Sequence, residues 1–459
     1  MYRTMQYHIK PGHKLYSYCK NTCTNASKLY NRANYILRQY ATAIRDFECF
    51  KPLTANQMSV FQLIRSATRE TKYEPSTKWM TYGSLDYVLK QTKDATYYGI
   101  FSQANQQILK LLLRDYKSFF NALKTYKNNS SLFNGRPRMP KYKKENALST
   151  AILTNQICKI QNAHFLKMPG TKTKLNLGLS ACDDKLKEVR IKKHANVFVI
   201  DVVLEYADSA NIVDDRTDKQ VIDSFKERKD FGELRVLGID PGLNNFCSVT
   251  NNCKLEPMLI NGRTLKSLNH YYNKRLAKLK KEAMLCNQQY STKRMERLHY
   301  KRNCKMKDKL HKISRYVANY AKDNNIDLVI IGHNTMQKQE INLGHVNNQH
   351  FVQIPFLVFA NMLRYKLEKY GIRLVMTEES YTSKADFLAL DEMPVYQKDQ
   401  NPNLSFSGTR VKRGLYKHGD GTYSNADING AANTIRKVFP NVSEWDRGIV
   451  NIPYAVTVA

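Results

Sequence analysis

Paired cysteines and long apolar runs are missing from this sequence, and acidic residues are few. No stretch of about eighteen uncharged apolar residues occurs, which is the length that a membrane-spanning helix needs. The opening residues, MYRTMQYHIKPGHK, lack the apolar run of a signal peptide. We therefore expect an intracellular protein with no membrane partner.

Nine cysteines are present, but no two of them form a CxxC pair. This pattern excludes a disulfide framework and a zinc ribbon. Cys19 and Cys23 are one helical turn apart and could form half of a metal site, yet no second pair follows. Free thiols in a reducing compartment are the better interpretation, and we predict that the protein holds no zinc.

The charge balance is strongly positive. The 459 residues include 73 Lys and Arg against 40 Asp and Glu, a formal net charge of +33 that is spread over the chain. A basic protein could simply bind acidic surfaces, but 29 Tyr and 18 Phe stand among the cations. Aromatic rings stack on unpaired bases while cations hold phosphates, so nucleic acid is the expected partner.

The length predicts two or three domains. A strand within residues 1–12 and alternating runs over 135–210 predict an antiparallel sheet or a small β-barrel. Apolar spacing of three and four predicts a helical lobe over 13–134 inserted into it. A simple bundle with a solvated polar face is the alternative for the lobe. Residues 211–232 have few apolar side chains and are predicted to be a linker. From 233 onward, strands that alternate with helices predict an α/β sheet.

Two basic segments are candidates for binding phosphates. The connector GRPRMPKYKKENAL contains two prolines and a cluster of cations, and the helical region 264–322 contains 13 Lys or Arg against 3 acids between residues 271 and 310. A solvated helix usually mixes both signs, so this excess favours contact with a nucleic-acid backbone. The candidates are Arg136, Arg138, Lys141, Lys143, Lys278, Lys281, Arg294, Lys301 and Lys305.

Two aspartates stand where elements of the α/β part begin or end. Asp240 ends the strand LRVLGID, and Asp427 lies at the front of the helix in SNADINGAANTIRKV. Each has an ordinary alternative, because Asp before Pro-Gly forms turns and Asp in a first helical turn stabilises the dipole. The small residues Gly430, Ala431 and Ala432 predict a helix pressed against the sheet, which would bring the two carboxylates together and require a cation.

A third carboxylate would complete such a ligand set. Glu378 and Glu379 both follow the strand GIRLVMT, and only one of them can point to the metal side because side chains alternate. Val375 and Thr377 share a face with Glu379, whereas Met376 shares one with Glu378. This pattern leaves both glutamates open.

Four segments together resemble the TnpB family of transposon-encoded, RNA-guided DNA endonucleases, relatives of the compact type V CRISPR effectors. They are GIDPGLNNFCSVT, KQEINLGHVNNQHFVQIP, EESYTSKADFLALDE and RGLYKHGDGTYSNADINGAANTIRKV, and the GRPRMPKYKK connector is also similar. The resemblance implies a multidomain α/β protein: a RuvC-like nuclease domain of RNase H fold over 233–379 and 425–459, and an N-terminal wedge-like β-barrel carrying a helical recognition lobe. It also implies one chain per guide RNA, double-stranded target DNA, a prokaryotic cytoplasm with the nucleoid as the bound location, and two Mg²⁺ ions held by Asp240 and Asp427.

The sequence departs from the family at two places. Gly332 stands where much of the family has its middle glutamate, but some members carry a relocated glutamate before the TS pair. Glu379, three residues before Thr382, matches that place and is the predicted third catalytic ligand, with Glu378 in reserve. Residues 380–424, the expected target-nucleic-acid-binding insertion, contain no cysteine for the zinc ribbon that members often carry.

Two other functions fit a protein of this architecture. One is a nuclease-dead, RNA-guided repressor, and the other is a DNA strand-transfer transposase. For reading the motif that flanks the target, the candidates are Tyr98, Gln103 and Gln107, although core or solvent roles fit them equally well.

Overall fold

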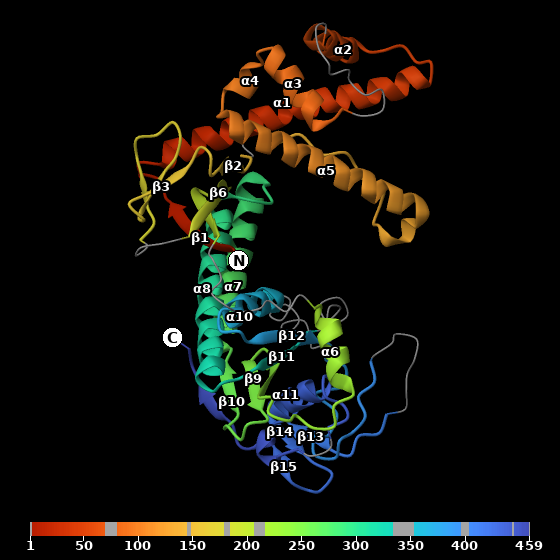
Figure 1. The fold of residues 1–459 in the computed structure, drawn as a ribbon, viewed down its shortest axis with the longest axis vertical. Coiled ribbons are helices and arrows are strands. Elements are labelled where there is room, and N and C mark those ends of the chain that lie inside the picture. The colour runs from red at the N-terminus through yellow and green to blue at the C-terminus, as the bar shows by residue number, and fades with distance from the viewer. Residues whose placement is uncertain are drawn as a thin grey trace. The chain divides into compact units, whose positions relative to one another are not determined.

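The computed structural model describes residues 2–68, 80–144, 148–178, 184–205, 216–333, 353–395, 404–442 and 445–458. The chain divides into two compact units, Met1–Asp208 and Ser209–Ala459 (Figure 1). Of the four segments similar to the TnpB family, KQEINLGHVNNQHFVQIP lies outside the described part over residues 338–352. Within the described helices, none is both long and apolar enough to cross a bilayer.

The helices of the first unit follow its first strand. They are α1 (Tyr16–Glu48), α2 (Ala55–Thr68), α3 (Tyr82–Gln91), α4 (Ala95–Tyr98), α5 (Ser102–Asn128) and the short η1 (Ser130–Leu132). The apolar residues of the longer helices recur every three or four positions, so each of these helices buries one face. Leu29, Ile36, Leu109 and Leu112 belong to the resulting core. The helical character predicted for 13–134 is thus present.

The strands of the first unit form two antiparallel sheets. The larger one has the order β1-β7-β6-β2, made of β1 (Tyr2–Ile9), β7 (Val197–Glu205), β6 (Lys185–His194) and β2 (Ala151–Thr154). The smaller one joins β3 (Lys159–Gln161), β4 (Phe165–Lys167) and β5 (Leu175–Asn176). Because β1 pairs with β7, the helices are inserted between two neighbouring strands. The ladders of the described residues give open sheets, and closure into a barrel stays a prediction.

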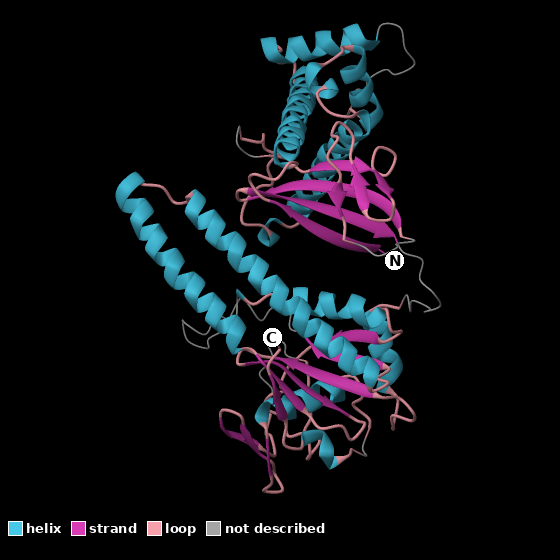
Figure 2. Ribbon diagram, turned by 90° about the vertical axis from the view of Figure 1, so that its left-hand side faces the viewer, coloured by secondary structure: helices cyan, strands magenta, loops and turns pink. Residues whose placement is uncertain are grey.

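A six-stranded mixed sheet forms the centre of the second unit (Figure 2). Its order is β12-β11-β8-β9-β10-β16, with bounds β12 (Arg373–Thr377), β11 (Leu328–Gly332), β8 (Val236–Pro241), β9 (Asn245–Asn251), β10 (Met258–Asn261) and β16 (Tyr454–Val456). Strands β8, β11 and β12 are parallel, whereas β9 is antiparallel to both of its neighbours. The chain is therefore a mixed α/β protein with more than one domain.

Alternating side chains of this sheet serve two separate cores, one on each face. Leu237 and Ile239 of β8 pack with the helices α8 (Lys293–Asp323) and α10 (Phe356–Glu368). Val236 of β8 and Ile330 of β11 pack instead with α11 (Ala426–Arg436). The face that carries α11 is the one on which the candidate site lies.

The predicted linker is wrong over part of its length. Residues 218–226 form helix α6 (Asp218–Lys226), whose N-terminus has a capping box between Thr217 and Gln220. The Asp218 carboxylate accepts hydrogen bonds from the guanidinium groups of Arg364 and Arg373 at 2.6 and 3.2 Å. Val221 is buried, and Ile222 and Phe225 pack against the same core, so ion pairs and apolar contacts together fix the helix to the second unit.

The basic helical region forms a long pair, α7 (Arg263–Asn287) followed by α8. Figure 2 shows the two helices running side by side. Residues 380–424, the expected insertion, contain a small antiparallel sheet of β13 (Thr409–Lys412), β14 (Leu415–Lys417) and β15 (Tyr423–Ser424). Strand β15 leads directly into α11, and the one-turn helix η2 (Arg447–Val450) follows α11 in the chain.

Candidate active site

Helix α11 lies unusually close to strand β8. A side chain added at Gly238 would approach the Ile435 Cγ1 atom to 2.4 Å and the Ala431 carbonyl oxygen to 2.7 Å, and one at Gly430 would approach the Asp240 Oδ2 atom to 2.9 Å. A larger residue at Gly238 would push the helix away, and one at Gly430 would displace the Asp240 carboxylate. The contact predicted from the small residues of this helix is therefore present, and it sets α11 directly against Asp240.

The surroundings of Asp240 disfavour the charged form of its carboxylate. Burial and the neighbouring negative charges of Glu379 and Asp427 raise the pKa of Asp240 well above its ordinary value, against a smaller lowering by Arg410. Within the described residues, no donor forms a hydrogen bond with this carboxylate. Glu379 and Asp427 are thus close enough to disfavour the charged form of Asp240, which is the condition that a bound cation relieves.

Glu379 occupies the space above Gly332. A Cβ at Gly332 would lie 2.4 Å from the Glu379 Oε1 atom, 2.7 Å from Cγ and 2.9 Å from Cδ. Strands β11 and β8 are paired in register at Ile331 and Ile239, so Gly332 is the neighbour of Asp240 at the adjacent position. Glu379, which follows β12, thus reaches toward Asp240 across β11, over a residue that has no side chain.

A turn after β12 holds the backbone of Glu379. The Thr382 amide and hydroxyl donate to the Glu379 carbonyl oxygen at 3.3 and 3.1 Å, and the Asn433 amide nitrogen donates to the Thr382 carbonyl oxygen at 3.0 Å. Asn429, one turn earlier on α11, donates to the Ala385 carbonyl oxygen at 2.8 Å. Helix α11 therefore clamps the loop that carries Glu379.

Glu378 is engaged elsewhere. Its carboxylate pairs with the buried ammonium group of Lys437 and accepts the Ser380 amide at 2.7 Å. Lys437 also donates to the Met393 carbonyl oxygen at 2.8 Å. Glu378 thus serves an ion pair at the other end of α11, while the assignment of Glu379 as the metal ligand stays a prediction.

Asp427 is held by two residues that were not predicted from the sequence. Asn245 donates to its Oδ2 atom and Arg410 to its Oδ1 atom, both at 2.8 Å. Asn425 caps α11 by accepting from the amides of Asp427 and Ile428. Asn245 stands in the GIDPGLNN motif, just past the turn that follows Asp240, and this position could have indicated a residue of the site. Arg410 lies in the insertion, and nothing in its local sequence indicates this contact.

The donor chemistry of the site suits a hard divalent cation, because all three acids offer carboxylate oxygens, the ligands that Mg²⁺ prefers. The close approach of Glu379 over Gly332 and the donor-free carboxylate of Asp240 fit such an ion. In the described part of the chain, no three His, Cys, Asp or Glu side chains are already grouped as a metal site. Asp427 is instead balanced by Arg410, so this carboxylate has to exchange partners for a shared ion to bind.

A buried polar network shapes the insertion beside α11. The His418 ring lies between Asp386, with Nδ1 2.6 Å from Oδ1, and Ser424, with Nε2 2.7 Å from Oγ. The other Asp386 oxygen accepts the Gly419 amide at 2.7 Å. All three side chains are buried. Hydrogen bonds therefore tie together loop segments on both sides of the small sheet.

The residues of the first unit that were predicted to contact nucleic acid differ in their exposure to solvent. Tyr98 is 61% exposed, whereas Gln103 and Gln107 of α5 are half-buried. Lys143 places its ammonium group 4.5 Å from the centre of the Tyr30 ring. Lys143 thus has a role within the unit, while Arg136, Arg138 and Lys141 are exposed.

The predicted contacts in the second unit all lie exposed on the helical pair. Lys278 and Lys281 belong to α7, and Arg294, Lys301 and Lys305 belong to α8. Their contacts with nucleic acid stay predictions.

The fold and this site define a mixed α/β multidomain protein with acidic side chains converging at a sheet edge. Residues 220–337 match the family model OrfB_IS605, described as "Probable transposase". Residues 356–434 match the model of the Cas12f1-like TNB domain. These matches confirm the resemblance to the TnpB family and relate the chain to compact type V effectors. No curated protein sequence matches this chain.

Solved structures of such effectors are distantly similar. A Cas12f1–sgRNA–target DNA complex is 12% identical, with 94% of this chain and 98% of that chain covered and a TM-score of 0.31. C2c1 of Alicyclobacillus acidoterrestris with single-guide RNA is 10% identical, with 93% and 70% covered and a TM-score of 0.37. CasPhi-2 with crRNA and phosphorothioate DNA is 10% identical, with 97% and 93% covered and a TM-score of 0.40. Scores at this level do not by themselves establish a common fold.

Proposed function

We propose that this chain is an RNA-guided DNA endonuclease that cleaves target DNA beside a short flanking motif by Mg²⁺-dependent phosphodiester hydrolysis. The observation that carries the proposal is the meeting of Asp240, Glu379 and Asp427 beside strand β8. The confirmed resemblance to the TnpB family supports the same reaction class.

The strand arrangement supports an RNase H-like, RuvC-like nuclease domain. A central β8 lies between the parallel β11 and the antiparallel β9, and the first acid ends that central strand. In the first unit, the insertion of helices between β1 and β7 supports a wedge-like domain of residues 1–12 and 135–210 that carries a recognition lobe of residues 13–134. Residues 380–424 are the proposed target-binding insertion.

Asp240, Glu379 and Asp427 are the proposed ligands of two Mg²⁺ ions. When bound, such ions activate the attacking water and stabilise the leaving oxygen of an in-line displacement. Asn245 orients Asp427, and Thr382 orients Glu379 through its carbonyl. Arg410 places a cation beside Asp427, and we assign it to binding the phosphate at the cleavage point.

The proposed partners are a guide RNA, with one chain per RNA, and double-stranded target DNA. A net charge of +33 supports a polyanionic partner, and base pairing by the guide would supply most of the sequence specificity. Under this proposal the protein works in a prokaryotic cytoplasm, at the nucleoid when bound.

The test is cleavage of a plasmid that matches the copurified RNA. RNA that copurifies with the full chain is sequenced, and the plasmid then carries the matching target beside randomised flanks. We expect Mg²⁺-dependent cleavage that chelation abolishes. Asp240→Ala and Asp427→Ala should remove cleavage and leave guide and target binding nearly intact, because only metal ligands are lost. Asp223→Ala, an exposed aspartate of α6, is the matched control and should cleave normally.

The ion pair of Arg410 with Asp427 is the observation that favours a nuclease-dead repressor, since it occupies one proposed ligand. A repressor would protect the matched site and leave the plasmid intact with every divalent ion tested. Joined DNA products without a defined copurified RNA would instead indicate a strand-transfer transposase.

A further inference from the structure

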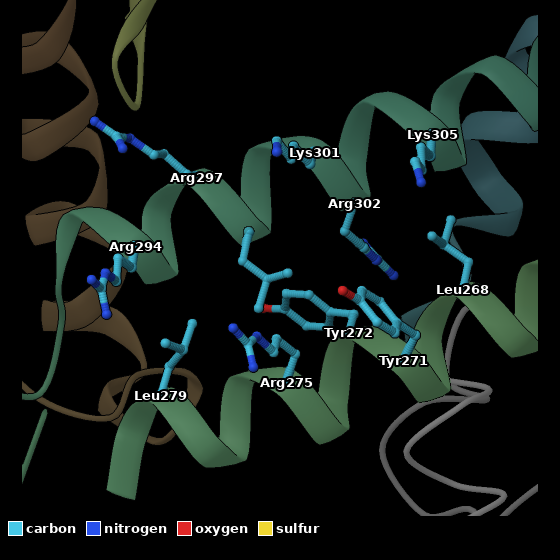
Figure 3. Close-up of a pocket in the computed structure, with 11 residues that line it drawn as sticks. Leu268, Tyr271, Tyr272, Arg275, Leu279, Arg294, Arg297, Lys301, Arg302 and Lys305 are labelled. Carbon is cyan, nitrogen blue, oxygen red and sulfur yellow. The ribbon is translucent and has the colours of Figure 1, made fainter. Parts of the chain in front are cut away.

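A groove of about 380 Å³ lies between helices α7 and α8, away from the carboxylates. Figure 3 shows Tyr272, Arg302 and Leu279 lying between the two helices, whereas Arg297 extends outward from α8. The members are apolar, aromatic or basic, and none is acidic: Leu268, Tyr271, Tyr272, Arg275, Leu279, Arg294, Arg297, Leu298, Lys301, Arg302 and Lys305.

The inner part of the groove is preformed. Tyr272 and Leu279 are 9% and 8% exposed, and the Tyr272 hydroxyl lies 3.1 Å from the His299 Nδ1 atom. The Arg302 guanidinium lies 5.7 Å from the centre of the Tyr272 ring and donates to the Asn269 side chain at 2.7 Å. These contacts fix the apolar surface before any ligand arrives, so a ligand would bind at little cost in ordering.

The rim of the groove carries cations that have no acidic partner among the residues that the structure describes. Arg294, Arg297, Lys301 and Lys305 follow one side of α8 at helical spacing and are exposed. Throughout the described residues, no ion pair links any of these four to a carboxylate. From Arg294 to Lys305 the stripe is about 16 Å long at the helical rise of 1.5 Å per residue, which is long enough to meet several phosphates of one strand.

Tyr271 supplies an accessible ring at this rim. Its side chain is 63% exposed and lines the groove opposite the cations of α8, as Figure 3 shows. An aromatic face for a base, next to cations for its phosphates, is the combination that binds unpaired nucleotides. A double helix has no free base to offer, so it would contact only the rim.

We propose that this groove binds an unpaired nucleotide of the guide RNA, with its base on Tyr271 and the phosphates of the surrounding strand along the cations of α8, among them Arg294, Arg297 and Lys301. This inference rests on the proposed function, which supplies a guide RNA as the partner. A folded RNA keeps nucleotides permanently unpaired in loops and bulges, whereas target DNA exposes unpaired bases only after unwinding. A preformed groove matches the ligand that is already unpaired.

The experiment measures binding and needs no cleavage. The full chain, stripped of nucleic acid, is titrated with fluorescein-labelled oligo(A) RNA of about twelve nucleotides, a size within the range of known single-strand sites. The same is done with a fully paired RNA hairpin and with oligo(dA). Separately, the complex with copurified RNA is crosslinked by ultraviolet light, and the crosslinked peptides are identified by mass spectrometry.

Tyr271→Ala is expected to weaken binding of oligo(A) RNA by roughly 5- to 100-fold, the effect of losing one base–ring stack. It should leave hairpin binding within about twofold, and Tyr271→Phe should bind oligo(A) as the wild type does because the ring is kept. Arg294→Ala should lower the salt dependence of oligo(A) binding by about one ion. Tyr290→Ala, a tyrosine that is 84% exposed and outside the groove, is the matched control.

The crosslink should fall on the peptide that contains Tyr271. The inference is overturned if Tyr271→Ala binds oligo(A) RNA normally, or if it weakens the hairpin equally. Tighter, Tyr271-dependent binding of oligo(dA) would make the ligand an unpaired DNA strand and would overturn the RNA assignment. If no plasmid is cleaved but Tyr271→Ala still loses oligo(A) RNA, the nuclease proposal fails while the groove assignment is supported.

Discussion

The substitution Gly332→Ala tests how the site obtains its third carboxylate. The new methyl group would lie 2.4 Å from the Glu379 Oε1 atom, 2.7 Å from Cγ and 2.9 Å from Cδ. No carbon atom tolerates such distances, so Glu379 has to leave its present rotamer. The backbone of β11 can stay in place, because alanine fits strand geometry.

The expected consequence is a large loss of cleavage with a small loss of stability. Holding a Glu379 side-chain torsion about 30° off its staggered position costs about 0.5–1.5 kcal/mol. A displacement of about 1 Å at a reacting centre can lower the rate by about 10²-fold. We therefore expect the cleavage rate of a matched plasmid to fall by about two orders of magnitude, with the cooperative thermal transition retained.

Two further variants make this prediction specific. Gly83→Ala is the matched control, because a Cβ there meets only the Thr81 hydroxyl at 3.9 Å. Gly332→Glu combined with Glu379→Ala returns the carboxylate to β11 and should recover part of the activity lost in Glu379→Ala. Cleavage by Gly332→Ala at the wild-type rate would refute the reasoning, since Glu379 would then be dispensable where it lies.

Three other substitutions have defined outcomes. Glu378→Gln should lower the free energy of unfolding by about 1–3 kcal/mol, because it leaves the buried Lys437 without its charged partner, while cleavage persists; loss of cutting with normal stability would reverse the assignment of the two glutamates. His418→Ala should cost a similar amount by urea denaturation, because Asp386 is fully buried and loses a hydrogen-bond partner; an unchanged denaturation midpoint would contradict this. Burial lowers the pKa of Lys366 in the folded chain to about 8, below the ordinary lysine value of 10.5. Between these two pH values the unfolded chain binds more protons than the folded chain does. The contribution of Lys366 to stability therefore rises with pH in this range. The stability of the wild type relative to Lys366→Met should increase across that window, and a flat difference in melting temperature would show that the pKa is ordinary.

The elements of the second unit were largely predictable because their signals are local. Strands β8, β11 and β12 are short apolar runs. In the helical pair, apolar residues recur every three or four positions over a long stretch. Helix α6 was missed for the opposite reason. The apolar residues of this short helix stand in a highly charged segment, and its position depends also on Arg364 and Arg373, which lie far along the chain.

The candidate site divides in the same way. Asp240 and Asp427 were found because each stands at a recognisable boundary of a strand or helix, and Gly430 with its neighbouring alanines indicated the close helix. Asn245 and Arg410 were missed as partners of Asp427 because side chains 182 and 17 residues away meet it only in the folded chain.

Charge and periodicity are properties of neighbouring residues, so the sequence alone was enough to predict a polyanionic partner, the alternation of strands and helices, and the two aspartates. It left Glu378 and Glu379 equivalent on alternation alone. Only the tertiary structure placed Glu379 over the bare backbone of Gly332 and Glu378 against Lys437. The physical reason is steric and electrostatic. The position of Glu379 depends on the space above Gly332 of β11, and that of Glu378 depends on the charge of Lys437 at the end of α11. Both are fixed only when the chain packs.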